Sequence, residues 1–475
     1  MKNKISRILF VCIVFFTLSG CFEDMDDTIR PASTLDIQDF IYKAMNIWYL
    51  YKPDVPDLAN DRFASQGELN EFLSTYSTPE ELYSNLLSDV DRFSFITSDY
   101  RVLLNQLDGI TKTHGMEFGL VYYPDSETNI FGYVQYVLPN SDAAAKGVTR
   151  GMIFNTINGA QITESNYADL STMSSYEIGL ATFDGETITP TGETVALTKT
   201  ELAENPVHIA KTITVENEKI GYLMYNGFTG EYESELNQAF GMFKNENITK
   251  LVLDLRYNSG GSVNTATRLA SMITGQFSGE VFYTEHWNPE LQANFEQNSP
   301  QDLVTNFMTQ LASGQPLNSL QLTKVYVLTT QRTASASELV INSLDPYIDV
   351  VQIGETTTGK FQASTTFFDS EPPYFSRDGA SISHHYAIQP LIYKTANANG
   401  VTDYVDGLFP DLEISEDFSN LGELGNPDET LLAAAINEIL NGRSQPFPNQ
   451  AQLKEVSNSK KHLLIYQRMY DTLDE

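Results

Sequence analysis

Apolar residues recur at helical spacing soon after residue 30. A stripe of them runs through residues 35–51, with Ser33 or Thr34 as the cap, and consists of Ile37, Phe40, Ile41, Ala44 and Trp48. Residues 78–81 read Thr-Pro-Glu-Glu, a capping box with proline in the first turn, which begins a helix that ends near Leu86. The pattern predicts a small helical module over residues 33–105.

Short apolar stretches separated by turn residues follow in residues 106–203. Their alternation predicts strands over 117–123, 131–137, 153–157 and 193–198. Asn158 and Gly159 form a typical hairpin turn. We therefore expect a β-rich module here.

Strand and helix patterns alternate in residues 204–442, which is typical of an α/β domain. Strands are predicted over 219–228 and 251–255, helices over 231–244 and 264–273, and an amphipathic helix over 428–440 closes the series. The polar C-terminal tail, residues 443–475, shows no clear pattern. The fold class that follows is multidomain α/β.

One stretch of this domain, residues 324–360, reads KVYVLTTQRTASASELVINSLDPYIDVVQIGETTTGK. It predicts a strand, a turn of small residues, a helix from Glu338, and a second strand followed by a loop that carries Lys360. A hydroxyl at such a turn lies beside the unpaired first N–H groups of the helix, which can stabilise an oxyanion. Ser335 and Ser337 are both candidate nucleophiles, and Lys360 is a candidate base.

A second group of candidate residues follows the strand predicted at 251–255. The loop after this strand contains Gly260 and Gly261. Glycines let a backbone approach a substrate and aim its N–H groups outward, as an oxyanion hole requires. Asp254 and Arg256 could act as acid and base, or they could pair structurally at the strand end.

Composition narrows the functional classes. The 475 residues are 41% hydrophobic and 11% aromatic, enough for several complete cores. The net charge of −33 argues against a nucleic-acid partner, because phosphate binding needs clustered Lys and Arg. The histidines are scattered or adjacent rather than at metal spacing, and no Gly-x-Ser-x-Gly elbow or phosphate loop occurs, so we predict no metal and no cofactor.

The first 20 residues have the plan of a signal peptide, with three basic residues followed by an apolar run at 8–18 that is too short for a confident membrane span. Residues 18–21, Leu-Ser-Gly-Cys, resemble the bacterial lipobox, in which the cysteine is acylated. Cys21 would then be the only cysteine left, which excludes a disulfide within the chain. The acidic tether at 21–32 resembles that of surface lipoproteins of Bacteroidetes. We expect an exported lipoprotein anchored to the outer membrane of a bacterial envelope.

Residues 134–159, VQYVLPNSDAAAKGVTRGMIFNTING, resemble the second half of a bacterial PDZ domain. Phe118, Gly119 and Leu120 stand where such domains place the loop whose N–H groups receive a peptide's C-terminal carboxylate. The resemblance implies that residues 106–203 bind peptides by adding a strand to a sheet edge. A PDZ fold kept as a hinge or lid without a ligand is the alternative.

The glycine pair, the Ser-Ala-Ser-Glu run at 335–338, the Gly-Lys pair at 359–360 and the Gly-Leu-Phe-Pro-Asp segment at 407–411 occur in this order after the PDZ pattern. Together they resemble the C-terminal processing (tail-specific) peptidases, which act on proteins or peptides through their C-termini. The resemblance implies a Ser–Lys peptidase core with Ser335 as nucleophile and Lys360 as general base. It implies oxyanion donors from the backbone N–H of Ala336 and of Gly260 or Gly261. The Lys360 amine must then be neutral at working pH, through desolvation.

One position departs from the family pattern. The family commonly places a glutamine four residues after the lysine, where this chain has Ser364, whereas Gln362 lies two residues after Lys360. The strand period of two puts both side chains on the face of Lys360, so either could orient it. Two alternatives to an enzyme stay open: a non-catalytic peptide- or ligand-binding lipoprotein on the same scaffold, and a surface lipoprotein that captures glycans or nutrients. The oligomeric state is not predicted.

Overall fold

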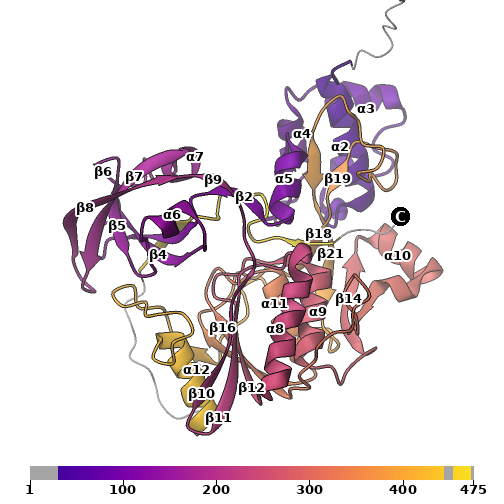
Figure 1. The fold of residues 1–475 in the computed structure, drawn as a ribbon. Coiled ribbons are helices and arrows are strands. Elements are labelled where there is room, and N and C mark those ends of the chain that lie inside the picture. Colours follow the sequence, from indigo (N-terminus) through magenta and orange to yellow (C-terminus); the bar gives the residue numbers. More distant parts are fainter. Residues whose placement is uncertain (1–29, 443–452, 472–475) are drawn as a thin grey trace, which may run out of the picture.

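Four helices build the first part of the chain in the computed structural model, which describes residues 30–442 and 453–471 (Figure 1). Ser33 caps the first helix by accepting the Asp36 N–H at 3.2 Å, and Thr78 caps the third by accepting the Glu81 N–H at 3.1 Å, as the sequence predicts. The helices are α2 (Thr34–Trp48), α3 (Gln66–Leu73), α4 (Pro79–Asn85) and α5 (Tyr100–Leu107).

This helical module shares one hydrophobic core with the α/β domain below it. The Trp48 ring packs on Phe367 at a centroid distance of 5.6 Å and on Trp287 at 5.8 Å. A three-stranded sheet also joins the two parts, in the order β1 (Phe95–Thr97), β20 (Ala387–Gln389), β19 (Phe367–Phe368). These contacts hold the helical module against β19 and β20, two strands that follow Lys360 in the chain.

The β-rich module lies to the left in Figure 1 and packs its own core of apolar side chains. Its sheet has the order β23-β3-β4-β5-β7-β8, with β6 paired to β5, and β2 pairs with β9 at its base. The elements are β2 (Ile110–Thr113), β3 (Met116–Tyr122), β4 (Ile130–Val137), α6 (Asp142–Ala145), β5 (Ile153–Ile157), β6 (Ala160–Gln161), α7 (Asp169–Thr172), β7 (Ser175–Phe183), β8 (Ile188–Thr198), β9 (Thr200–Ala203) and β23 (Glu455–Asn458).

A six-stranded sheet forms the α/β core, in the order β10-β11-β12-β16-β17-β22, and it is parallel except for the β10–β11 pair. Helices α8, α9 and α11 cover one face, and α12 covers the other. The elements are β10 (Val207–Val215), β11 (Glu218–Tyr225), α8 (Glu233–Glu246), β12 (Lys250–Asp254), α9 (Val263–Ile273), β16 (Lys324–Thr329), α11 (Ala336–Leu344), β17 (Asp349–Gly354), β22 (Leu412–Glu413) and α12 (Thr430–Asn441). The fold class is multidomain α/β, as expected.

A second six-stranded sheet stands beside the core, in the order β13-β24-β18-β21-β14-β15. Its elements, with the helix that follows β14, are β13 (Gly261–Ser262), β14 (Val281–Trp287), α10 (Pro289–Asn298), β15 (Val304–Asn306), β18 (Gln362–Ser364), β21 (Leu391–Ala396) and β24 (Met469–Tyr470). Strands β23 and β24 belong to residues 453–471, here called the tail segment. The stretch without a sequence pattern thus contributes a strand to each of two sheets.

Within residues 30–442 and 453–471, no helix combines the length and apolar character needed to cross a bilayer. The predicted signal peptide and Cys21 lie outside the described residues.

Candidate active site

Ser335 stands at the turn between β16 and α11, at the carboxyl edge of the parallel sheet. Its backbone has φ 66° and ψ −116°, a conformation that a non-glycine residue adopts only where its surroundings enforce it. The side chain is fully buried, and its hydroxyl has no hydrogen-bond partner among the residues that the structure describes. Ala336 begins α11, so its N–H is one of the first-turn donors that a helix leaves unpaired.

The second candidate serine has a different environment. The Ser337 hydroxyl, also buried, donates a hydrogen bond of 3.1 Å to the Asn258 carbonyl oxygen and so ties α11 to the loop after β12. Of the two serines, Ser335 alone has a hydroxyl without a partner in the described part of the chain. The geometry therefore favours Ser335 as the nucleophile.

Lys360 follows β17 and is completely buried. Its amine has no hydrogen-bond partner in the described residues and lies 5.3 Å from the centre of the Phe93 ring. Burial first, and the nearby guanidinium of Arg468 second, hold the pKa of Lys360 well below its ordinary value. A neutral amine that accepts a proton is what a general base requires.

The Glu338 carboxylate connects the serine and the lysine. Its Oε2 accepts the backbone N–H of Ser335 at 2.7 Å and that of Lys360 at 2.9 Å. Its Oε1 accepts the Gly359 N–H at 2.7 Å and the Thr357 hydroxyl at 2.5 Å. One buried carboxylate thus holds the backbones of both residues, a role that the sequence reasoning missed although Ser335 and Glu338 have capping-box spacing.

The two glycines after β12 differ in what their N–H groups do. The Gly260 N–H donates to the Asn258 side chain at 2.9 Å, whereas the Gly261 N–H donates to the Arg468 carbonyl oxygen at 2.6 Å. At Gly260, φ is 113°, and a Cβ there would lie 2.7 Å from the Ser335 Cβ. Gly261 is therefore the glycine that offers a donor to a bound carbonyl beside Ser335.

Asp254 and Arg256 pair with each other rather than with the site. The Arg256 guanidinium is fully buried and lies 2.9 Å from Asp254, 2.7 Å from Glu429 and 3.1 Å from Glu416. This network joins the end of β12 to the segment before α12. The structural alternative is confirmed, and in the described residues no group of three His, Cys, Asp or Glu side chains is placed to hold a metal ion.

Neither candidate for the orienting contact to Lys360 makes it. The Gln362 amide donates to the Tyr51 hydroxyl at 2.7 Å, while its carbonyl oxygen is buried without a partner in the described residues. The Ser364 hydroxyl donates to the Met469 carbonyl oxygen at 3.0 Å. These side chains of β18 bind the helical module and β24 instead, so the expected support of Lys360 by position 362 or 364 is wrong.

Phe118, Gly119 and Leu120 are also placed differently from the expectation. They lie within strand β3, paired with β4 on one side and β23 on the other, so the expected loop at these residues is wrong. The apolar run that predicted a strand over 117–123 continues through all three positions, because its residues are buried on both faces of the sheet.

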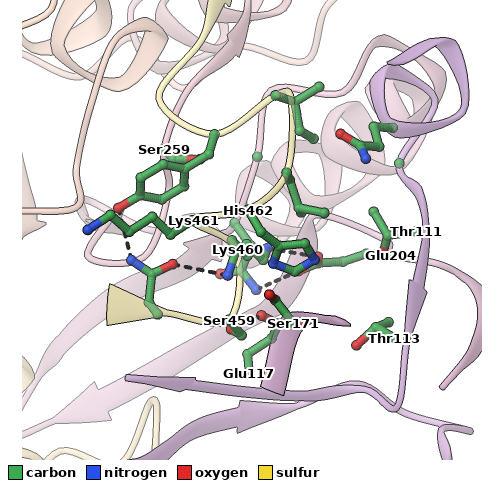
Figure 2. Close-up of a pocket in the computed structure, with 18 of the residues that line it drawn as sticks. Thr111, Thr113, Glu117, Ser171, Glu204, Ser259, Ser459, Lys460, Lys461 and His462 are labelled. Atoms are coloured by element: carbon green, nitrogen blue, oxygen red, sulfur yellow. Dashed lines mark hydrogen bonds and ion pairs between the residues drawn. The ribbon is translucent and has the colours of Figure 1, made fainter. Parts of the chain in front are cut away.

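A cavity of about 280 Å³ separates the β-rich module from the core (Figure 2). It reaches from Glu117 and Glu204 to the glycine pair, and residues 457–463 of the tail segment form one wall. The tail segment therefore connects the sheet edge of the β-rich module to the neighbourhood of Ser335.

Comparisons with known proteins identify two regions of the chain. Residues 36–95 match the peptidase S41 N-terminal domain, and residues 219–392 match peptidase family S41. A carboxyl-terminal-processing protease from Picosynechococcus is 28% identical over 249 residues, and one from Synechocystis is 23% identical over 249 residues. These matches cover 52% of the chain and 52% and 50% of the two relatives, so the chain spans about half the length of the curated relatives it matches.

A solved structure also resembles most of the described fold. The putative S41 protease from Bacteroides fragilis is 28% identical, with a TM-score of 0.66, and the likeness covers 86% of this chain and 98% of that one. The chain therefore carries both the N-terminal domain and the peptidase domain of peptidase family S41.

Proposed function

We propose that the chain is a serine endopeptidase that cleaves proteins or peptides near their C-termini, with Ser335 as nucleophile and Lys360 as general base. The observation that carries the proposal is a pair of fully buried groups, the Ser335 hydroxyl and the Lys360 amine, for which the described residues offer no hydrogen-bond partner. The backbones of the two residues share the Glu338 carboxylate. A buried amine without a hydrogen-bond partner is costly to a fold, which makes a functional site the better explanation.

The reaction follows from these positions. Ser335 Oγ attacks the carbonyl carbon of the scissile bond, and its proton passes to the neutral Lys360 amine. The Gly261 and Ala336 N–H groups stabilise the oxyanion. Lys360 then gives the proton to the departing amine, and water hydrolyses the acyl group from Ser335 with Lys360 again acting as base.

The β-rich module is proposed to be a PDZ domain that binds the substrate's terminus. The pairing of β23 with β3 supports this role, because it places an added strand at the sheet edge that PDZ domains use for peptides. We also propose that Cys21 is acylated and anchors the exported chain to the outer membrane. Replacing Cys21 with alanine should release a soluble protein, and continued membrane association would count against the anchor.

The test of the activity compares the wild type with Ser335→Ala, Lys360→Ala and Ser337→Ala on an unstructured protein that ends in apolar residues. Loss of degradation in the first two variants and its retention in the third is expected, measured as the rate at which new C-termini appear. Equal degradation by all four proteins would exclude the dyad. No degradation by the wild type at any pH would favour the non-catalytic binding protein.

A further inference from the structure

The tail segment occupies the peptide-binding edge of the β-rich module. Strand β23 runs antiparallel to β3, with Glu455 opposite Val121 and Asn458 opposite Gly119. Arg332 of the core lies 3.0 Å from the Glu455 carboxylate, an ion pair that fixes the start of the strand. The chain's own residues thus form the added strand that a bound peptide would provide.

Between its two strands, the tail segment is held by the walls of the cavity (Figure 2). The Lys460 amine lies 2.8 Å from the Glu204 carboxylate, and the Ser459 hydroxyl donates to Glu117. The next lysine, Lys461, is exposed, and its amine donates to the Val456 carbonyl of its own segment at 3.2 Å. The two adjacent lysines therefore differ sharply in their attachment to the rest of the molecule.

The second strand of the tail segment, β24, lies in the groove between Gly261 and the strand that follows Lys360. Strand β24 lies between β13, which begins at Gly261, and β18, which begins two residues after Lys360. The Met469 carbonyl of β24 accepts a hydrogen bond from the Ser364 hydroxyl at 3.0 Å. The carbonyl of Asp471, which follows the strand, accepts one from the Thr365 hydroxyl at 2.8 Å. Backbone pairing of this kind holds a chain in an extended conformation whatever its side chains are.

The Arg468 carbonyl takes the place of a scissile carbonyl. Its oxygen accepts the Gly261 N–H at 2.6 Å. A Cβ on Gly260 would lie 2.4 Å from this oxygen and 2.7 Å from the Ser335 Cβ, so the carbonyl and the serine side chain border the same point. The peptide bond between Arg468 and Met469 thus lies beside the side chain of Ser335, whose hydroxyl has no partner in the described residues.

The Arg468 side chain fills the space next to the general base. Its Nε donates to the Leu464 carbonyl at 3.0 Å, its Nη1 donates to the Phe93 carbonyl, and its guanidinium lies 4.6 Å from the centre of the Phe95 ring. Burial lowers the pKa of Arg468 to about 10, and its positive charge disfavours the protonated form of Lys360. The residue before the presented bond therefore helps to keep the base neutral.

We propose that the tail segment is bound as a substrate of its own active site and that Ser335 cleaves the bond between Arg468 and Met469. The inference rests on the proposed peptidase function. Ser335 Oγ forms an ester with the Arg468 carbonyl while the C–N bond breaks, and Lys360 passes the serine proton to the Met469 nitrogen. Water then hydrolyses the ester, restoring Ser335 and leaving Arg468 with a free carboxylate.

Self-cleavage would also control access to the site. Ser335 and Lys360 are completely buried beneath the uncleaved tail segment, so an external peptide has to displace β24 before it reaches them. After cleavage, the peptide that begins at Met469 keeps the pairing of β24 and the hydrogen bonds at Asp471, but it loses its covalent link to the rest of the tail segment. It can then dissociate and open the groove.

Intact-mass spectrometry of the full chain over time tests the inference, with sequencing of any released peptide. The wild type should lose a peptide that begins at Met469, at a rate per molecule that does not change on dilution, and Ser335→Ala should stay intact. Lys460→Met should release this peptide at least several-fold more slowly, because it loses the ion pair with Glu204. The matched control Lys461→Met should behave as the wild type.

Three results would overturn the inference: a wild type that degrades an external protein while its own tail stays intact, cleavage at another bond, or a rate that falls with dilution. In the first case β24 is a permanent strand of the sheet and the peptidase proposal survives. Failure to cut either the tail or an external protein would instead refute the peptidase proposal itself.

Discussion

Replacing Glu338 with glutamine tests whether one carboxylate holds the serine and the lysine in place. Both oxygens of Glu338 accept two hydrogen bonds each, from three backbone N–H groups and the Thr357 hydroxyl. A glutamine keeps one oxygen and turns an NH2 group toward two donors, whichever way the amide is oriented. Those donors lose their acceptor inside a fully buried site.

The magnitude follows from the two donors that the glutamine leaves unsatisfied. An unsatisfied buried donor costs about 1–3 kcal/mol, so two of them cost roughly 2–6 kcal/mol. Burial raises the pKa of Glu338, although its hydrogen bonds lower it, so the buried charge is itself unfavourable. Removing the charge therefore offsets part of the loss in the free energy of unfolding. We expect the free energy of unfolding to fall by about 2–4 kcal/mol, measured by urea denaturation. We also expect kcat to fall at least tenfold with a smaller change in KM, because misplacing the reacting groups affects the chemical step.

Glu355→Gln is the matched control for this experiment. Glu355 lies on the loop that carries Lys360, and its carboxylate accepts a long hydrogen bond of 3.4 Å from the Gln331 N–H and a side-chain hydrogen bond from Ser415. The control should change the free energy of unfolding by less than about 1 kcal/mol and leave kcat unchanged. The reasoning is refuted if Glu338→Gln keeps the stability and kcat of the wild type, or if both variants lose the same amount.

The remaining predictions concern Lys360, Gly260 and Arg256. Since the pKa of Lys360 is lowered, kcat/KM should rise with pH along a limb well below pH 10.5, and a limb at the ordinary lysine pKa would contradict a buried base. Between the lowered pKa and about pH 10.4, Lys360 carries a proton in the unfolded chain but not in the folded chain. The free energy of unfolding of the wild type should therefore rise with pH over this range, and Lys360→Met should remove the rise. Gly260→Ala should reduce kcat/KM at least 100-fold, because its Cβ meets the serine side chain, whereas Gly279→Ala, with φ 83° and open space, should leave kcat/KM unchanged. Arg256→Met should lower the free energy of unfolding by about 3–5 kcal/mol in urea titrations, because three buried carboxylates lose an ion pair and, among the described residues, only Glu416 keeps another close one, to Arg150; a loss below about 1 kcal/mol would contradict that network.

Local patterns in the sequence predict the elements that carry the site but not all of its hydrogen bonds. The caps at Ser33 and Thr78 follow from side-chain chemistry within a few residues, as does the strand-turn-helix around Ser335. Glu338 has capping-box spacing, yet its bonds to Gly359 and Lys360 come from residues 21 and 22 positions further along the chain. Such bonds depend on how β17 packs beside β16, which no local pattern encodes.

The tail segment shows a different limit of prediction from sequence. Strands β23 and β24 are four and two residues long, and backbone hydrogen bonds hold them in sheets made by distant residues. Their sequences therefore need little of the apolar alternation that marks a strand. The apolar run containing Phe118 and Leu120 predicts strand β3 correctly. Its pairing with β23 could not be predicted, because β23 lacks such a pattern.

Covalent labelling tests the central claim most directly. A serine-directed phosphonofluoridate is incubated with the wild type, Lys360→Met and Ser335→Ala, and the labelled residue is mapped by tandem mass spectrometry. The account predicts a single adduct on Ser335 in the wild type, a strongly reduced yield in Lys360→Met, and none in Ser335→Ala. An adduct on Ser337, or equal labelling of Ser335 with and without the lysine, would contradict it.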